Sequence, residues 1–260
     1  MFRTGFKQFA SFNCVFAALT CLLLGSVGSA QDLKALRIDG ERFSFDDGKL
    51  SFRGVIIRPE GKGPFPAILI SHGMGSTGER FGRPKAVQFV KWGFVCIAPD
   101  YAHVDGKGDR KDFGASEENL SRAKKCLDIL ESLPDVDSKR VCAYGNSMGA
   151  FVTIGLAAEE PKRLVAAAIT AGGVNTVSGF PAPSKGQAAK IKTPFCILHG
   201  AKDTTVPPER SKLLEDVLKT NQIACERHIF EGVGHDLHVA KAKEVNGKIE
   251  EWFRKHTDPK

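Results

Sequence analysis

The residues best suited to covalent chemistry lie in the pentapeptide Gly145-Asn146-Ser147-Met148-Gly149. A short apolar run at 140–144 precedes it, and a helix-like run at 150–158 follows it. Strand, Gly-x-Ser-x-Gly and helix, in that order, are the context of a nucleophile elbow, a turn so tight that its flanking positions must be glycine. Such a turn lifts the hydroxyl of the central serine clear of the sheet. The pattern also occurs by chance, so partners elsewhere in the chain decide whether Ser147 is a nucleophile.

An acid and a base that would suit Ser147 follow later in the chain. Asp203 comes after an apolar run at 194–198, and His235 lies in a Gly-rich loop after the run at 223–230. A serine hydroxyl is a poor nucleophile until an adjacent base takes its proton. His235 would take that proton and return it to the leaving group, while Asp203 would fix the tautomer of the imidazole. We therefore predict Ser147, Asp203 and His235 as the catalytic residues.

The same chemistry needs hydrogen-bond donors for the oxyanion that forms on the attacked carbonyl. The backbone N–H of Met148 lies at the start of the helix that follows Ser147. The N–H of Met74 lies in a Gly-rich loop after an apolar run at 65–71. These are the two donor positions of a strand–elbow–helix serine site, so we predict Met74 and Met148 as the oxyanion hole.

Several of these polar residues have a competing structural interpretation. Asp203 could be a turn residue or the N-cap of the next helix. His238 lies three residues after His235, but it is nearer the final helix and lacks the Gly-x-Gly approach. His72 and His199 each precede a glycine at a strand end, where hydrogen bonds to loop backbone are the expected role. We prefer the catalytic role for Asp203 and His235 and the structural role for His72 and His199.

The elements that must position these residues alternate along the chain. From residue 65 onward, strand-like and helix-like runs follow one another, which predicts a parallel sheet with helices on both faces. Ligands bind beyond the C-terminal ends of the strands of such a sheet, where the candidate residues all fall. Two earlier strands form a hairpin around Asp46-Asp47-Gly48. The predicted strands are 35–45, 50–58, 65–71, 94–98, 140–144, 164–170, 194–198 and 223–230, and the predicted helices are 84–92, 116–133, 150–158, 208–220 and 240–255.

The fold class predicted is therefore α/β, with a mostly parallel central sheet of about eight strands in a single domain over 31–260. Residues 171–192 carry four glycines and little periodicity, which indicates a long loop or a small cap. Loops at the C-terminal edge of the sheet would form the walls of a substrate pocket. The residues predicted to line it are Tyr101, Phe113, Phe180, Val206 and Leu237.

The first thirty residues have a different composition from the rest. Arg3 and Lys7 precede an apolar run at 15–24, and small residues lead to Ala30. This pattern predicts a secretory signal peptide at 1–30, cleaved after Ala30, because the apolar run is short for a membrane span. Cleavage would change the formal charge from +7 to +5, a mild excess without a basic run, which predicts no binding to nucleic acid.

Seven cysteines in the full chain become five after cleavage, so at least one thiol stays free. Their pairing is not predicted for Cys96, Cys126, Cys142, Cys196 and Cys225. No Cys-x-x-Cys or Cys/His cluster occurs in the sequence, so we predict no metal and no cofactor.

Taken together, these motifs resemble the α/β-hydrolase superfamily, and in particular the dienelactone hydrolase family. The resemblance covers most of the chain after residue 30. It is carried by Gly63-Pro64-Phe65-Pro66-Ala67 leading to Ser71-His72-Gly73, Ala98-Pro99-Asp100, Val136-Asp137 leading to Arg140-Val141, the pentapeptide around Ser147, His199-Gly200-Ala201-Lys202-Asp203 with Val206-Pro207, and Gly234-His235. Dienelactone hydrolases proper have a cysteine nucleophile, whereas position 147 is serine here.

The expected function is that of a secreted or periplasmic serine hydrolase that cleaves small carboxylic esters through an acyl-enzyme. The predicted partner is a small-molecule ester, with no stable membrane association after signal cleavage. A peptidase or amidase of the same fold is the alternative, because it uses the same three residues. A non-catalytic binding protein on this scaffold would be expected to lack one of the three, and all are present.

Overall fold

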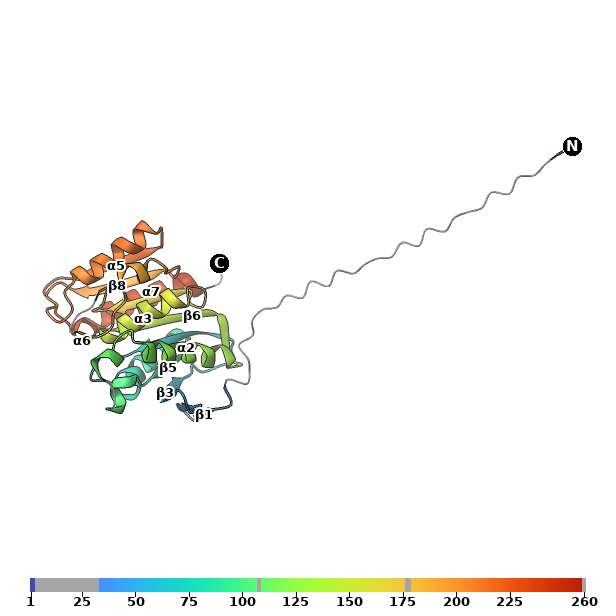
Figure 1. Ribbon diagram of the computed structural model, residues 1–260, viewed down its shortest axis with the longest axis horizontal. Helices are drawn as coiled ribbons and strands as arrows, with labels where there is room; N and C mark the ends of the chain where they lie inside the picture. The colour runs from blue at the N-terminus through green and yellow to red at the C-terminus, as the bar shows by residue number, and fades with distance from the viewer. Residues whose placement is uncertain (3–32, 107–108, 176–178, 259–260) are drawn as a thin grey trace.

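The computed structural model describes residues 1–2, 33–106, 109–175 and 179–258. The predicted signal peptide at 1–30 therefore lies outside the described residues, apart from its first two. The described chain forms one nine-stranded sheet in the order β1-β2-β3-β5-β4-β6-β7-β8-β9. In Figure 1 the colour changes from blue at β1 to orange at β8, so the N-terminal and C-terminal strands lie at opposite ends of the sheet.

The central strands are the apolar runs of the sequence. They are β4 (Phe65–Ser71), β5 (Val95–Pro99), β6 (Val136–Asn146), β7 (Ala166–Thr170), β8 (Phe195–Gly200) and β9 (Cys225–Phe230), all paired in parallel. Every residue of β5, β7 and β8 is buried, as expected for strands covered on both faces. The prediction of a mostly parallel α/β sheet is confirmed.

The N-terminal strands are antiparallel and differ from the predicted pair. The run at 35–45 is not one strand, because Gly40, with a φ of 57°, turns the chain between β1 (Leu36–Asp39) and β2 (Arg42–Asp46). The hairpin to β3 (Ser51–Ile57) follows as predicted. This extra turn raises the number of strands to nine.

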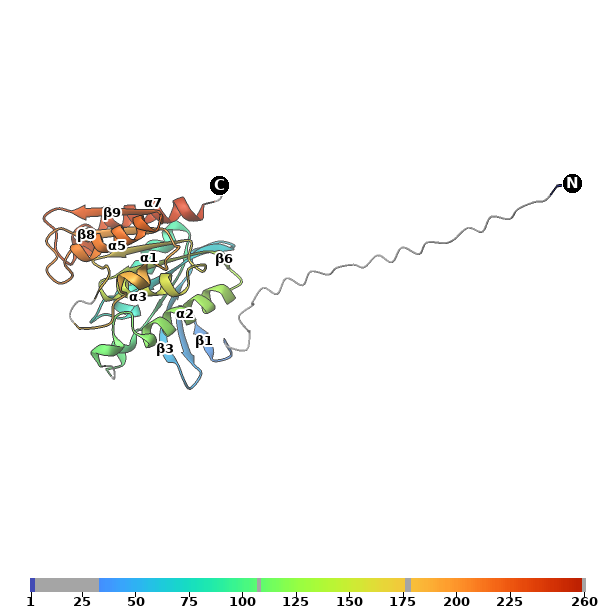
Figure 2. The same ribbon diagram turned by 45° about the horizontal axis from the view of Figure 1, so that its top comes forward.

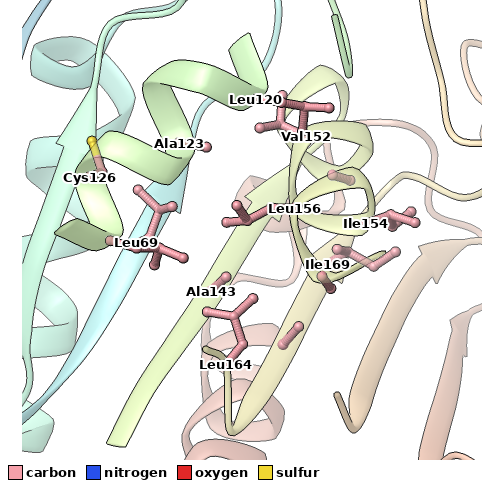
Figure 3. Packing of buried hydrophobic residues seen from close by; sticks show 14 of the residues in the cluster. Leu69, Leu120, Ala123, Cys126, Ala143, Val152, Ile154, Leu156, Leu164 and Ile169 are labelled. Carbon is pink, nitrogen blue, oxygen red and sulfur yellow. The ribbon is translucent and has the colours of Figure 1, made fainter. Parts of the chain in front are cut away.

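Helices cover both faces of the sheet, because neighbouring residues of each buried strand point to opposite sides. On one face Leu69 packs with α2 (Glu117–Ser132) and α3 (Met148–Glu159), and α5 (Glu209–Thr220) belongs to the same core. On the other face Ile68 packs with α1 (Arg83–Phe89) and α7 (Ala242–Thr257). Figure 2 shows β9 and α7 at one end of the sheet and β1 and β3 at the other, and Figure 3 shows the side chains of α2 and α3 meeting those of β4, β6 and β7.

The remaining elements are short and lie in the connections. They are a π-helix (Gly78–Gly82), three 3-10 helices (Val90–Trp92, Ala102–Asp105, Arg110–Asp112), α4 (Lys185–Ala188) and α6 (Leu237–Ala240). The segment 171–192 thus carries one helical turn, with 176–178 outside the described residues. Within the described chain, all five cysteines are free thiols and four of them are buried. No helix in this part of the chain combines the length and apolar character needed to cross a bilayer.

Candidate active site

Ser147 stands at a sharp turn between β6 and α3. Its backbone has a φ of 53° and a ψ of −117°, a conformation that costs a non-glycine residue about 1–3 kcal/mol. The turn is held by hydrogen bonds from Ser147 N to Thr170 O (2.9 Å) and from Ala150 N to Ser147 O (2.9 Å). A Cβ added to Gly145 would lie 2.2 Å from Gly149 O, so the turn cannot close around a larger residue there. The local geometry is that of a nucleophile elbow.

His235 joins Ser147 to Asp203. Its Nε2 lies 2.8 Å from Ser147 Oγ, and its Nδ1 lies 2.8 Å from Asp203 Oδ2. An ionised carboxylate only accepts hydrogen bonds, so Nδ1 carries the proton and Nε2 is left to accept from the serine hydroxyl. Asp203 is buried, whereas Ser147 and His235 are half-buried. The fold therefore brings together the three residues predicted from the sequence, with the serine and the histidine reachable from solvent.

Asp203 accepts four hydrogen bonds. Its Oδ1 accepts from the N–H of Thr205 and the N–H of Val206, both at 2.9 Å, and its Oδ2 accepts from His235 and from His199 Nε2 (3.2 Å). Burial alone would raise the pKa of Asp203, but the hydrogen bonds from His199, His235 and Val206 outweigh it and hold that pKa below its usual range. Asp203 is not the N-cap of α5, a position that Pro208 occupies. It does close the turn at 203–206 while facing His235.

The backbone segments that carry the two predicted oxyanion donors lie beside Ser147. Met148 is the first residue of α3, so its N–H has no carbonyl one turn earlier in the helix to bond. The loop that carries Met74 passes beside the elbow, because a Cβ added to Gly73 would lie 3.4 Å from Ser147 Cβ. The Met74 residue is exposed. Both backbone segments are thus next to Ser147.

His72 holds the loop that carries Met74. Its Nδ1 lies 3.0 Å from Gly73 O, an atom that also accepts from Ser76 N, and its Nε2 accepts from Tyr101 N at 3.4 Å. Burial lowers the pKa of His72 to about 4, so the ring is neutral at pH 7 and donates from Nδ1. This is the loop-backbone role expected for a histidine at a strand end.

The predicted pocket walls are mostly core residues. The Tyr101 and Leu237 side chains have no exposed surface, and Tyr101 donates or accepts a 2.6 Å hydrogen bond with Ser71 Oγ. Val206 and Phe180 are also buried, Phe180 against the edge of Phe151. The side chains of these four residues therefore point inward, and their role as pocket walls stays a prediction.

Phe113 differs from those four because it is half-buried. Its ring packs against His103 at 5.5 Å between centroids, and it remains a predicted wall. His238, the rival to His235, packs against Phe81 at 5.5 Å between ring centroids. Burial, followed by the charge of Lys85, lowers the pKa of His238 to about 4, and it is His235 whose Nε2 meets Ser147 Oγ.

A polar chain beneath the elbow escaped sequence reasoning. Thr170 Oγ1 donates to Asn146 Oδ1 at 2.8 Å, and the Tyr144 hydroxyl lies 3.0 Å from the same Oγ1. All three side chains are buried, and they tie β6 to β7 just before Ser147. The feature of the sequence that could have indicated this chain is Asn146, a polar residue at the end of an otherwise apolar run.

The chain is similar to known hydrolases. The family described as "Dienelactone hydrolase family" matches residues 52–256. The uncharacterized peptidase YtmA of Bacillus subtilis is 24% identical over 79% of this chain and 89% of its own length. The esterase FrsA of Enterobacter sp. is 30% identical over 46% of this chain but only 28% of its own length. A thermophilic esterase of Thermogutta terrifontis, solved with butyrate bound, superposes with a TM-score of 0.65 at 19% identity, covering 88% of this chain and 98% of that one. The chain belongs to the dienelactone hydrolase family of the α/β-hydrolase superfamily.

Proposed function

We propose that this protein is a secreted serine hydrolase that cleaves carboxylic esters of small molecules through an acyl-enzyme, without a cofactor. The observation that carries the proposal is the position of His235, whose two ring nitrogens each lie 2.8 Å from Ser147 Oγ or Asp203 Oδ2. This arrangement gives a serine the adjacent base that it needs to attack a carbonyl.

The reaction would run in two stages. Ser147 Oγ attacks the ester carbonyl while His235 Nε2 takes the hydroxyl proton, and the N–H groups of Met74 and Met148 stabilise the oxyanion. The alcohol leaves with the proton from His235. Water then attacks the acyl-Ser147 ester, His235 again acts as base, and the carboxylic acid is released. Asp203 stays ionised throughout and stabilises the imidazolium.

The choice of esters over amides rests on the relatives. Esterases are among them, and one structural neighbour holds butyrate, a short carboxylate of the kind that ester cleavage releases. A peptidase activity is the second candidate, because one relative that matches 79% of this chain is named as an uncharacterized peptidase.

Turnover of paired substrates tests the proposal. p-Nitrophenyl esters of short acids should be cleaved with a kcat/KM well above that of aminoacyl p-nitroanilides. Ser147→Ala should lose the ester activity, while Ser132→Ala should keep it, because Ser132 ends α2 just before β6 begins and Ser147 follows the other end of that strand. Turnover of anilides alone would replace the ester proposal with the peptidase, and equal turnover by Ser147→Ala would contradict both.

Secretion is proposed from the pattern of residues 1–30. Expression of the full chain in a bacterial host should yield a periplasmic or extracellular protein that begins at Gln31, as read by mass spectrometry. A cytoplasmic protein that keeps its first residues would contradict this part of the proposal.

A further inference from the structure

We infer that His199 is a positioning residue for Asp203: it is a second imidazole on the carboxylate that orients His235. This role rests on the proposed function, since it concerns the acid of the same site. His199 lies at the C-terminal end of β8, and its Nε2 is 3.2 Å from Asp203 Oδ2 and 2.8 Å from Val206 O. His199 and Asp203 are both buried.

The neighbours of His199 fix its tautomer. Val206 O is a carbonyl oxygen that only accepts, so the hydrogen bond at 2.8 Å requires the proton to be on Nε2. The same N–H is then shared with Asp203 Oδ2. His199 Nδ1 is buried and has no hydrogen-bond partner in the described part of the chain, which fits the bare nitrogen of a neutral ring. His199 is therefore a neutral donor to Asp203.

The donor from His199 completes the shell of hydrogen bonds around the carboxylate. Asp203 accepts from His199 at the end of β8 and from His235 in the loop after β9. It also accepts from the N–H groups of Thr205 and Val206 in its own turn. Among the described residues it forms no ion pair with lysine or arginine. Two imidazoles thus share Oδ2, and one of them belongs to a rigid central strand.

Two effects follow from this sharing. The turn at 203–206 holds Oδ1 through two N–H groups, and the bond from the strand adds a contact on Oδ2 that helps to keep the plane of the carboxylate at the angle that His235 Nδ1 needs. The bond also withdraws negative charge from Oδ2. Without the bond from His199, the more negative carboxylate would stabilise the imidazolium form of His235. A higher pH would then be needed to deprotonate His235 to the free base.

Kinetics of two substitutions test this role. His199→Phe keeps a planar ring but removes the donor, while His199→Gln can place an amide N–H near the position of the imidazole Nε2. We expect His199→Phe to lower kcat about tenfold to a hundredfold with little change in KM. The acid limb of its kcat/KM profile should move upward by about half to one pH unit. His199→Gln should recover most of both properties.

The matched control is His228→Gln. His228 lies on the neighbouring strand β9, where its nearest charged partner is Glu226 at 3.5 Å, and this variant should keep the wild-type kcat and pH profile. A folded His199→Phe with wild-type kcat and an unmoved acid limb would overturn the positioning role. A fall in kcat with no shift of the limb, and no recovery in His199→Gln, would also overturn it, because it would indicate packing alone.

A measurement on the wild type covers the case in which the variants do not fold. Long-range ¹H–¹⁵N spectra of assigned, labelled protein at neutral pH should show His199 neutral with its proton on Nε2. A proton on Nδ1, or on both nitrogens, would overturn the inference. Failure of the proposed function is separate and visible: it would appear as a wild type without Ser147-dependent ester turnover, whatever His199 does.

Discussion

Gly149 sits directly against the carbonyl oxygen of Ser71: a Cβ added to Gly149 would lie 2.1 Å from that oxygen. This contact seats the first turn of α3 on the end of β4, and the residues after Ser71 form the loop that carries Met74. The turn that carries the nucleophile and the loop that carries the predicted second oxyanion donor are thereby joined through a close backbone contact, which a residue larger than glycine at position 149 would disturb.

Gly149→Ala should therefore lower both stability and activity. The added methyl group must push β4 away from α3, and such overpacking costs about 1–3 kcal/mol of the free energy of unfolding. Urea unfolding and ester turnover measure the two effects. The matched control is Gly247→Ala in α7, where an added Cβ meets nothing within 4 Å and alanine should stabilise the helix by about 0.5–1 kcal/mol. Equal stability of the two variants would contradict the tight seat.

Asp203→Asn should keep the fold and lower kcat by about 10⁴. The amide oxygen would accept from the N–H groups of Thr205 and Val206, so the NH₂ group would face the two imidazoles and favour the wrong tautomer of His235. The comparison is Asp216→Asn, an exposed aspartate of α5 that pairs with Lys212 and has no contact with the site. Turnover of Asp203→Asn close to that of Asp216→Asn would show that Asp203 is not the acid.

His72 should make stability fall on mild acidification. The ordinary pKa of a histidine is 6.5, and burial lowers the pKa of His72 to about 4 in the folded protein. Between these values the unfolded chain binds more protons, so the free energy of unfolding decreases as pH falls, by up to about 1.4 kcal/mol per pH unit. The contribution is fully present above pH 6.5 and is lost by about pH 4.

Urea unfolding of the wild type and His72→Gln between pH 7 and pH 4.5 would measure this difference in slope. The glutamine variant does not titrate, so its stability should fall less over this range. Between pH 7 and 8 the two proteins should have parallel curves, which serves as the internal control. Identical slopes at acidic pH would show that folding does not lower the pKa of His72, and would contradict the prediction.

The sequence was sufficient for the parallel strands and for the meeting of Ser147, His235 and Asp203. The apolar runs indicated strands that are buried on both faces. Because parallel strands end at the same edge of a sheet, the residues that follow these strands could be placed together without knowledge of their contacts. The split at Gly40 was missed although the apolar alternation changes phase there, from Leu36 and Ile38 before the glycine to Phe43 and Phe45 after it. Strand β6 begins at Val136, four residues earlier than predicted, because Val136 pairs with Phe65 of β4 ahead of an irregularity in the register, and the polar residues at 137–140 obscured this start.

Side-chain direction in loops was beyond the sequence. Tyr101 and Leu237 lie at the predicted edge, but the turn of the backbone at each position sends the side chain into the core. The second donor to Asp203 was missed for a related reason: His199 precedes Asp203 by four residues, and only the fold of the turn decides that its Nε2 faces the carboxylate.

The central claim, that Ser147 is an activated nucleophile, is tested most directly by covalent labelling with a fluorophosphonate and mass spectrometry of the digested protein. One adduct is expected, on the peptide that contains Ser147. Ser147→Ala should be labelled little, and His235→Ala should be labelled slowly. A wild type that gains no adduct, or that gains it on another residue, would contradict the role of Ser147 as an activated nucleophile.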